Sequence, residues 1–126
     1  MTLKEQALEH WRENLKRLKA MNWSEWCGMD GRLRRHEILD AASSYAPQIG
    51  GRHCSFCQFY SENCHVTTSG PSPACMTHAR CPLYDITIPG RCCKEWESVR
   101  DALLRPTTKS AASRAINKMI KRLEAL

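Results

Sequence analysis

One stretch in the middle of the chain holds seven of its eight cysteines, and it constrains the fold more than any other feature. The seven are Cys54, Cys57, Cys64, Cys75, Cys81, Cys92 and Cys93. The stretch contains few aliphatic residues, whereas fixing the backbone costs roughly 1–2 kcal/mol per residue. Because so little apolar surface is available, hydrophobic burial alone cannot offset that cost. The stretch therefore needs cross-links, made either by disulfides or by a metal ion.

The spacing of these residues favours a metal ion. Cys54-Ser55-Phe56-Cys57 places two thiols on one tight turn, from which both can reach the same tetrahedral ion. After 17 residues a Cys-x-x-His pair follows at Cys75 and His78, which is zinc-ribbon spacing. Together with His53 and His65, the donors exceed one tetrahedral site and nearly suffice for two. The sequence therefore predicts structural zinc and leaves open one ion or two.

Two other uses of the thiols stay open. A disulfide framework requires an oxidising compartment, and residues 1–6 contain no apolar run typical of a secretory signal. A redox Cys-x-x-Cys normally lies in βαβ surroundings, which the sequence around Cys54 does not predict. We therefore expect zinc as the cofactor and a cytoplasmic location.

The adjacent Cys92 and Cys93 open a run with helical spacing. A thiol at a helix N-terminus is easily deprotonated, because the exposed N–H groups stabilise the thiolate. Only one of two neighbouring side chains can comfortably face the ion. Cys92 shares a helical stripe with Trp96 and Val99, so we predict Cys92 as a ligand and Cys93 as a small buried apolar residue.

Several short motifs occur in a characteristic order. They are Ala7-Leu8-Glu9-His10-Trp11-Arg12-Glu13-Asn14, Cys54-Ser55-Phe56-Cys57, Cys64, Cys81-Pro82-Leu83, and Cys92 followed by Trp96. These motifs resemble a group of small, mostly uncharacterised, cysteine-rich zinc-knuckle proteins of tailed bacteriophages, over about half of the chain. The resemblance implies a phage origin, the host cytoplasm as location, and zinc. It implies no activity.

The chain departs from that group in two places, one spacing and one position where histidine replaces cysteine. The third and fourth cysteines usually form Cys-x-x-Cys-Pro, whereas Cys64 and Cys81 lie 17 positions apart here. His78 preserves the short spacing to Cys81, so His78 or Cys75 is an alternative to Cys64. On these matches the predicted zinc ligands are Cys54, Cys57, Cys81 and Cys92. The reserve ligands, or a second site, are Cys64, Cys75 and His78.

The segments on either side of the cysteines predict helices. Thr2-x-x-Glu5 is a capping box ahead of an apolar stripe, and a last helix is predicted from about Thr108 to Ala125. The two stripes match, so these helices are expected to pack within the chain or across a homodimer. We predict a mainly α fold, in which N- and C-terminal helices pack around a zinc-stapled, loop-rich cysteine segment with little β structure. One domain, 1–126, comprises a helical part at 1–49, the zinc-binding segment at 50–93 and C-terminal helices at 94–126.

The remaining elements are predicted from local patterns. Residues 22–31 are expected to be turn-like with packed tryptophans and a buried Cys27, and a second helix is expected over 32–46 with Tyr45 on its apolar face. Residues 67–73 are expected to form an exposed loop, and 83–88 a short strand. No apolar run reaches the roughly 18 residues of a membrane span, so no membrane partner is expected.

Charge indicates the kind of partner. Nineteen Lys and Arg face thirteen Asp and Glu, which gives a net charge of +6 and permits nucleic acid or another acidic partner. The candidate contact residues are Arg32, Arg34, Arg35, Lys118, Lys121 and Arg122. The first three stand at a predicted helix start, which is the unfavourable end for cations. The last three lie on the final helix, opposite a stripe with Ile116, Met119 and Leu123 that is expected to be buried.

The motifs of common enzymes are missing from the sequence. There is no His-x-Glu of a zinc deaminase, no His-Glu-x-x-His and no glycine-rich phosphate loop. We therefore expect a non-enzymatic protein, a phage accessory protein that binds nucleic acid. The alternative is a protein on the same zinc-stabilised scaffold that binds and inhibits a host protein, such as a defence effector or polymerase. Salt dependence would separate the two, because phosphate contacts weaken steeply with salt.

Overall fold

A computed structural model describes residues 1–40, 43–50, 66–67, 70–71, 83 and 93–126, and this part of the chain is mainly helical. Its helices are α1 (Leu3–Ala20), α2 (Trp23–Gly28), α3 (Gly31–Leu39), α6 (Lys94–Leu104) and α7 (Lys109–Glu124). Two short antiparallel strands, β1 (Val66–Thr67) and β2 (Gly70–Pro71), pair Val66 with Pro71 and Thr67 with Gly70. The predicted mainly α class is confirmed, whereas the strand pair lies where a loop was expected. Most of the strand predicted over 83–88 falls outside the described residues.

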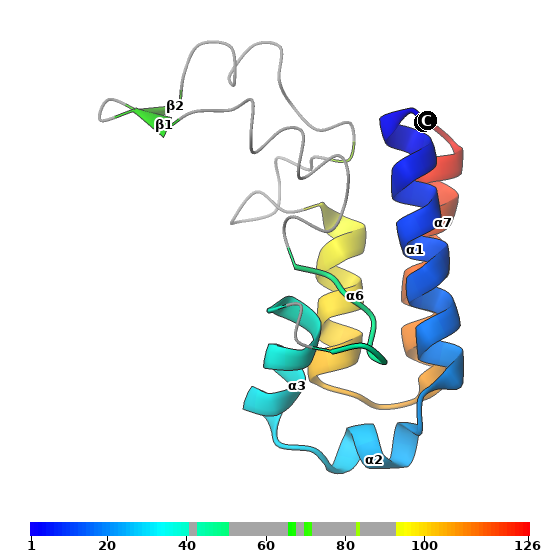
Figure 1. Cartoon of the computed structure of the whole chain (residues 1–126), viewed down its shortest axis with the longest axis vertical. Helices are drawn as coiled ribbons and strands as arrows, with labels where there is room; N and C mark the ends of the chain where they lie inside the picture. Colours follow the sequence, from blue (N-terminus) through cyan, green and yellow to red (C-terminus); the bar gives the residue numbers. More distant parts are fainter. Residues whose placement is uncertain (41–42, 51–65, 68–69, 72–82, 84–92) are drawn as a thin grey trace.

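The first and last helices lie antiparallel and side by side (Figure 1). The predicted N-cap of α1 is confirmed, since Thr2 Oγ1 accepts from the backbone N–H of Glu5 at 3.1 Å. Thr108, at the predicted start of the last helix, caps α7 in the same way. Lys4 Nζ donates to the Glu124 carbonyl at 3.2 Å, so a cation from α1 covers the C-terminal end of α7. The apolar stripes of both helices therefore meet within one chain, as one of the two predicted arrangements has it.

At the other end of the α1–α7 pair, a lysine of α7 covers the C-terminal end of α1. Lys109 Nζ donates to the carbonyls of Lys19 and Met21, both at 2.8 Å. The last carbonyls of a helix have no partner within it, and a lysine ammonium there also opposes the negative end of the helix dipole. The two lysines thus fix the register of α1 on α7 at both ends.

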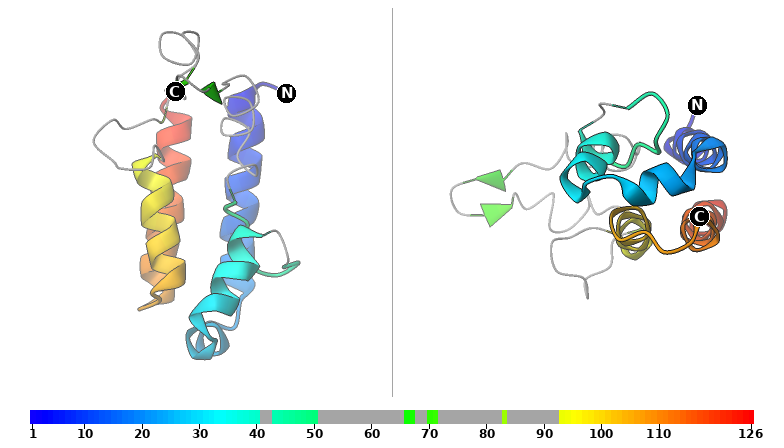
Figure 2. Two further views of the ribbon diagram at one scale, coloured as in Figure 1. Left: turned by 90° about the vertical axis from the view of Figure 1, so that its left-hand side faces the viewer. Right: turned by 90° about the horizontal axis from the view of Figure 1, so that it is seen from below.

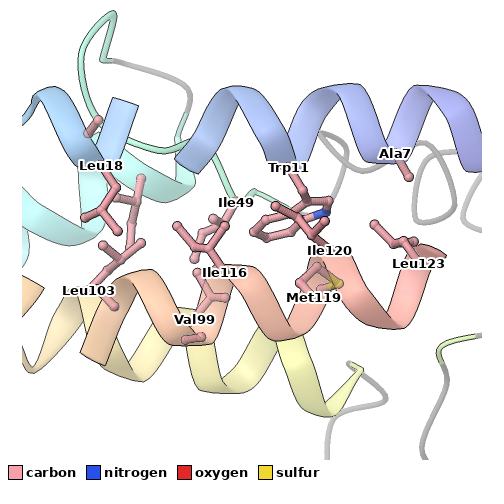
Figure 3. Packing of buried hydrophobic residues seen from close by; sticks show 14 of the residues in the cluster. Ala7, Trp11, Leu18, Ile49, Val99, Leu103, Ile116, Met119, Ile120 and Leu123 are labelled. Carbon is pink, nitrogen blue, oxygen red and sulfur yellow. The ribbon is translucent and has the colours of Figure 1, made fainter. Parts of the chain in front are cut away.

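The core lies between α1, α6 and α7 (Figure 3). Trp11 points from α1 toward Met119 and Ile120 of α7, and Val99 of α6 lies beside Ile116. The predicted burial of Ile116, Met119 and Leu123 is confirmed. Leu83, of the Cys81-Pro82-Leu83 motif, is 2% exposed and belongs to the same cluster. The core is therefore built from both ends of the sequence, and Leu83 joins it from the few described residues of the cysteine-rich segment.

Trp23 and Trp26 lie on the short helix α2, whereas a turn was expected there. Asn22 Oδ1 accepts from the backbone N–H of Glu25 at 3.2 Å, which is an N-cap that the sequence reading missed. Trp26 is buried and its Nε1 donates to the Leu103 carbonyl at 2.9 Å, so the expected packing of this indole is confirmed. Cys27, expected to be buried, is exposed, because it lies on the outer side of α2.

The predicted second helix is shorter than expected. It ends at Leu39 and does not continue to residue 46. Ser43 Oγ accepts from the backbone N–H groups of Tyr45 (3.1 Å) and Ala46 (2.9 Å), and such side-chain bonds hold the backbone in a turn in place of a helix. Tyr45 consequently lies 49% exposed and not on an apolar helix face.

The segment after this turn, residues 43–50, fills the space between α3 and α1. Seen along the helix axes, α1, α7, α6 and α3 occupy four corners, and the segment passes from α3 to α1 (Figure 2). The backbone N–H of Ile49 donates to the Ile38 carbonyl of α3 at 2.9 Å.

Among the helices described, none is long and apolar enough to cross a membrane.

Candidate functional site

The predicted metal ligands all lie outside the described residues. They are Cys54, Cys57, Cys81, Cys92, Cys64, Cys75 and His78. Within the ranges that the structure describes, no group of three or more His, Cys, Asp and Glu side chains could hold a metal ion. The structure does describe the helices α1, α2, α3, α6 and α7 and residues 43–50, to which the cysteine-rich segment is attached. We call this part of the protein the frame.

The frame holds the chain just ahead of that segment through α1. Asn14 is 1% exposed, and its side-chain amide pairs with both backbone groups of one residue: Oδ1 accepts from Gln48 N at 2.9 Å and Nδ2 donates to Gln48 O at 3.0 Å. His10 Nε2 lies 2.8 Å from the same carbonyl oxygen. A carbonyl only accepts, so Nε2 carries the proton and donates. Because His10 and Asn14 are four residues apart, they lie on one face of α1.

This pairing gives a structural role to the His-Trp-x-x-Asn part of the N-terminal motif. His10 and Asn14 hold the backbone of Gln48, while Trp11 points into the core. Arg17, one turn further on, donates from Nη1 to the Ala46 carbonyl at 3.1 Å. Polar side chains of α1 thus supply the hydrogen-bond partners that the buried backbone groups of Ala46 and Gln48 require.

We expect Asn14→Ala to lower the free energy of unfolding by about 1–3 kcal/mol, because the buried N–H of Gln48 loses its acceptor. Asn14→Asp should cost more, since the carboxylate still accepts from Gln48 N but repels Gln48 O. Urea denaturation of the purified variants measures both, and Arg12→Ala on the exposed face of α1 is the matched control. If Asn14→Ala unfolds within about 0.5 kcal/mol of the wild type, like an ordinary surface change, the amide pairing is not a stabilising contact.

The two ends of the cysteine-rich segment are joined across the frame. Trp96 Nε1 donates to the Ile49 carbonyl at 2.6 Å, so the chain before residue 51 lies next to the chain after residue 92. Cys93 caps α6: its sulfur accepts from the backbone N–H of Trp96 at 3.4 Å, and its side chain is half-buried at the edge of the core. Together with the buried Leu83, these contacts attach the segment at its start, within it and at its end.

The start of α6 bears on the choice between Cys92 and Cys93 as a metal ligand. The helix begins at Lys94, with Cys93 as its N-cap, so Cys92 precedes the helix. The helical stripe that was used to assign Cys92 to the metal does not extend that far. The choice of Cys92 over Cys93 stays a prediction, supported by the match to Cys92 followed by Trp96.

The first basic cluster divides into two kinds of residue. Arg32 and Arg35 are exposed. Arg34 donates from its guanidinium to the carbonyls of Trp26 (3.3 Å), Cys27 (3.5 Å), Met29 and Leu104 (3.3 Å). These carbonyls stand at the C-terminal ends of α2 and α6, where a helix lacks its own donors. Arg34 therefore joins α2, α3 and α6, and its position at the start of α3 is explained by contacts within the chain.

The second basic cluster is exposed, as predicted. Lys118 and Lys121 point outward from α7, and Arg114, which the sequence reading left out, lies on the same face at helical spacing. None of these three forms an ion pair with the described residues. Arg122 differs, because its Nε lies 3.8 Å from Glu95 Oε1 on α6. We call Arg114, Lys118 and Lys121 the α7 basic face.

Comparison of the chain with protein-family models, with curated protein sequences and with solved structures finds no match in any of the three. A function has to be argued from the residues of this chain and their arrangement.

Proposed function

We propose that this protein binds nucleic acid without catalysing a reaction, as a small zinc-stabilised accessory protein of the phage type that its motifs resemble. The observation that supports this most directly is the α7 basic face. Its three cations are exposed, and no described carboxylate pairs with them. Free cations on a rigid helix attract phosphate groups, and they do so without regard to base sequence.

The spacing of the α7 basic face suits a phosphate backbone. Arg114 and Lys121 are seven residues apart on α7, which corresponds to about 10 Å along the helix axis. Arg12 and Lys19 are further exposed cations on α1, which lies beside α7. The carboxylates Glu95 and Glu97 lie on α6, where they pair with Arg122 and Arg100.

Zinc has a structural role in this proposal. The predicted ligands are Cys54, Cys57, Cys81 and Cys92, with Cys64, Cys75 and His78 in reserve or in a second site. When bound, the ion supplies a cross-link that replaces the missing apolar core of the segment. The frame favours this cross-link, because the Trp96–Ile49 hydrogen bond already brings the ends of the segment together and lowers the entropy cost of closing it.

Charge reversal of the α7 basic face tests the proposal. In the variant Arg114→Glu, Lys118→Glu, Lys121→Glu, we expect weaker binding of labelled single-stranded and duplex DNA, with the slope of log K against log salt reduced by about 2–3. Fluorescence anisotropy across a salt series measures this. Zinc content and melting temperature should stay close to wild type, because all three side chains are exposed.

A second variant, Arg32→Glu with Arg35→Glu, serves as the comparison on the other exposed basic cluster. If only this variant loses binding, the contact surface lies on α3. If both folded, zinc-loaded variants bind DNA like the wild type, the nucleic-acid proposal is wrong, and binding of a host protein such as a defence effector or polymerase takes its place. A pull-down from host lysate with and without nuclease then identifies that partner.

A further inference from the structure

An open pocket of about 500 Å³ lies at the C-terminal end of α1, beside the turn that follows α3. Lys16, Arg17 and Asn22 line it from the α1 side, and Ser44 and Tyr45 line it from the turn. None of the three α7 cations is among the described residues that line it. The pocket thus combines basic and hydrogen-bonding side chains with an aromatic ring.

Tyr45 is held in this pocket with much of its surface exposed. Its exposed fraction is 49%, which is large for an aromatic side chain. Ser43 Oγ fixes the backbone at Tyr45, Arg17 binds the Ala46 carbonyl next to it, and the hydroxyl of Tyr45 donates to Met29 Sδ at 3.8 Å. The ring is therefore positioned by its neighbours and not left to rotate freely. Partial burial, with the negative charges of Glu37 and Glu25, raises the pKa of Tyr45, so the phenol is neutral at physiological pH.

The pocket is connected to the α7 basic face by basic residues on the outside of α1. Lys16 is exposed and forms no ion pair within the described part of the chain. Arg12 and Lys19 are exposed on the same helix, which packs against α7. The contact of Lys109 with the Lys19 carbonyl places the N-terminal half of α7 beside the C-terminal half of α1. Glu13 also lines the pocket, but it lies 3.9 Å from Arg17 Nε and its charge is partly offset.

We propose that this pocket receives an unpaired base of single-stranded nucleic acid, stacked on the ring of Tyr45, with the neighbouring phosphates against Lys16. The inference rests on the proposed nucleic-acid binding and states which form of nucleic acid is bound. Proteins that bind single strands combine a positively charged path along the backbone with aromatic side chains on which bases stack. In a duplex the bases are stacked on each other and do not reach the ring, so Tyr45 contributes only to the binding of single strands.

The test compares Tyr45→Ala with Tyr45→Phe in the full-length, zinc-loaded protein. Tyr45→Ala should weaken binding of a labelled oligo(dT) roughly ten- to hundredfold, the range expected for loss of one base-stacking platform. Binding of a duplex of the same length should be unchanged. Tyr45→Phe retains the ring and should bind oligo(dT) like the wild type. Lys16→Glu should weaken oligo(dT) binding and flatten its salt dependence.

The outcomes separate this inference from the proposal on which it rests. If charge reversal of the α7 basic face weakens binding but Tyr45→Ala binds oligo(dT) like the wild type, the stacking inference is wrong and nucleic-acid binding stands. If neither change affects binding, and Arg32→Glu with Arg35→Glu also binds like the wild type, both are wrong. Photocrosslinking of the unaltered protein to an oligonucleotide with 5-iodouracil avoids any folding defect of Tyr45→Ala. A crosslink to the peptide that contains Tyr45 is expected, and crosslinks confined to other peptides would overturn the inference.

Discussion

Replacement of Ile116 by aspartate is expected to unfold the helical part of the protein. Ile116 is fully buried between α1, α6 and α7, where no described cation could pair with a carboxylate. The change removes a buried aliphatic side chain, which alone costs about 2–5 kcal/mol, and adds an unpaired polar group that must be desolvated. The sum is comparable with the total stability of a small domain, about 5–15 kcal/mol.

Two control variants on the same helix isolate the cause. Lys118→Asp introduces the same side chain at an exposed position and should change stability by about 0.5 kcal/mol or less. Ile116→Val keeps the site apolar and should cost about 0.5–1.5 kcal/mol. Far-UV circular dichroism during urea titration measures all three. Cooperative unfolding of Ile116→Asp near the wild-type midpoint would show that the packing of α7 against the core is misassigned.

Removal of zinc is expected to have the second large effect, confined to the cysteine-rich segment. The purified protein should carry at least one zinc per chain, because structural zinc sites supply apparent folding energies of about 10–16 kcal/mol. A chelator should make residues 51–92 sensitive to protease. Most of the helical signal should persist, since the core lies between α1, α6 and α7, and Leu83 is its only member among the described residues of that segment. Elemental analysis and limited proteolysis measure the two results.

Serine variants assign the ligands. Cys54→Ser, Cys57→Ser, Cys81→Ser and Cys92→Ser should each lower zinc content. Cys27→Ser changes an exposed residue and should be mild. Cys93→Ser is the sharper control, because serine is a better N-cap than cysteine and the start of α6 should keep or gain stability. Loss of zinc from Cys93→Ser equal to that from Cys92→Ser would reverse the assignment. A protein without zinc whose thiols titrate as disulfides would refute the metal site.

The parts of the fold that the sequence predicted correctly are those set by local signals. The cap Thr2 with the apolar stripe behind it located the start of α1, and the apolar stripe of the last helix located α7 to within a residue or two. The predicted end of the second helix, residue 46, is too late in the sequence because the apolar spacing continues to Tyr45. In the structure the hydroxyl of Ser43 binds the backbone and stabilises a turn. A side-chain bond of this kind competes with a helix, and residue spacing does not reveal which arrangement prevails.

The contacts that define the frame and the basic surfaces depend on residues far apart in the sequence. Asn14 and His10 could be placed on one helix face from their spacing, but their common partner Gln48 could not. Arg34 was predicted to contact a partner because the sequence gives no sign that it binds the Leu104 carbonyl, which lies far from it in the chain. Arg114, in contrast, could have been grouped with Lys118 from helical periodicity alone.

The hydrogen bond from Trp96 to the Ile49 carbonyl has a consequence for how a chain of this kind can change in length. Because the frame fixes both ends of the intervening chain, an added loop should leave the helices of the frame in place and cost the entropy of a longer closure, about 0.6 kcal/mol for each doubling. We therefore expect insertions and deletions between Gly50 and Leu83 to be tolerated as long as the proposed zinc ligands are retained. The wide separation of Cys64 and Cys81 is what such tolerance would produce, and it makes this part of the protein a natural place to graft a foreign peptide without altering the helices.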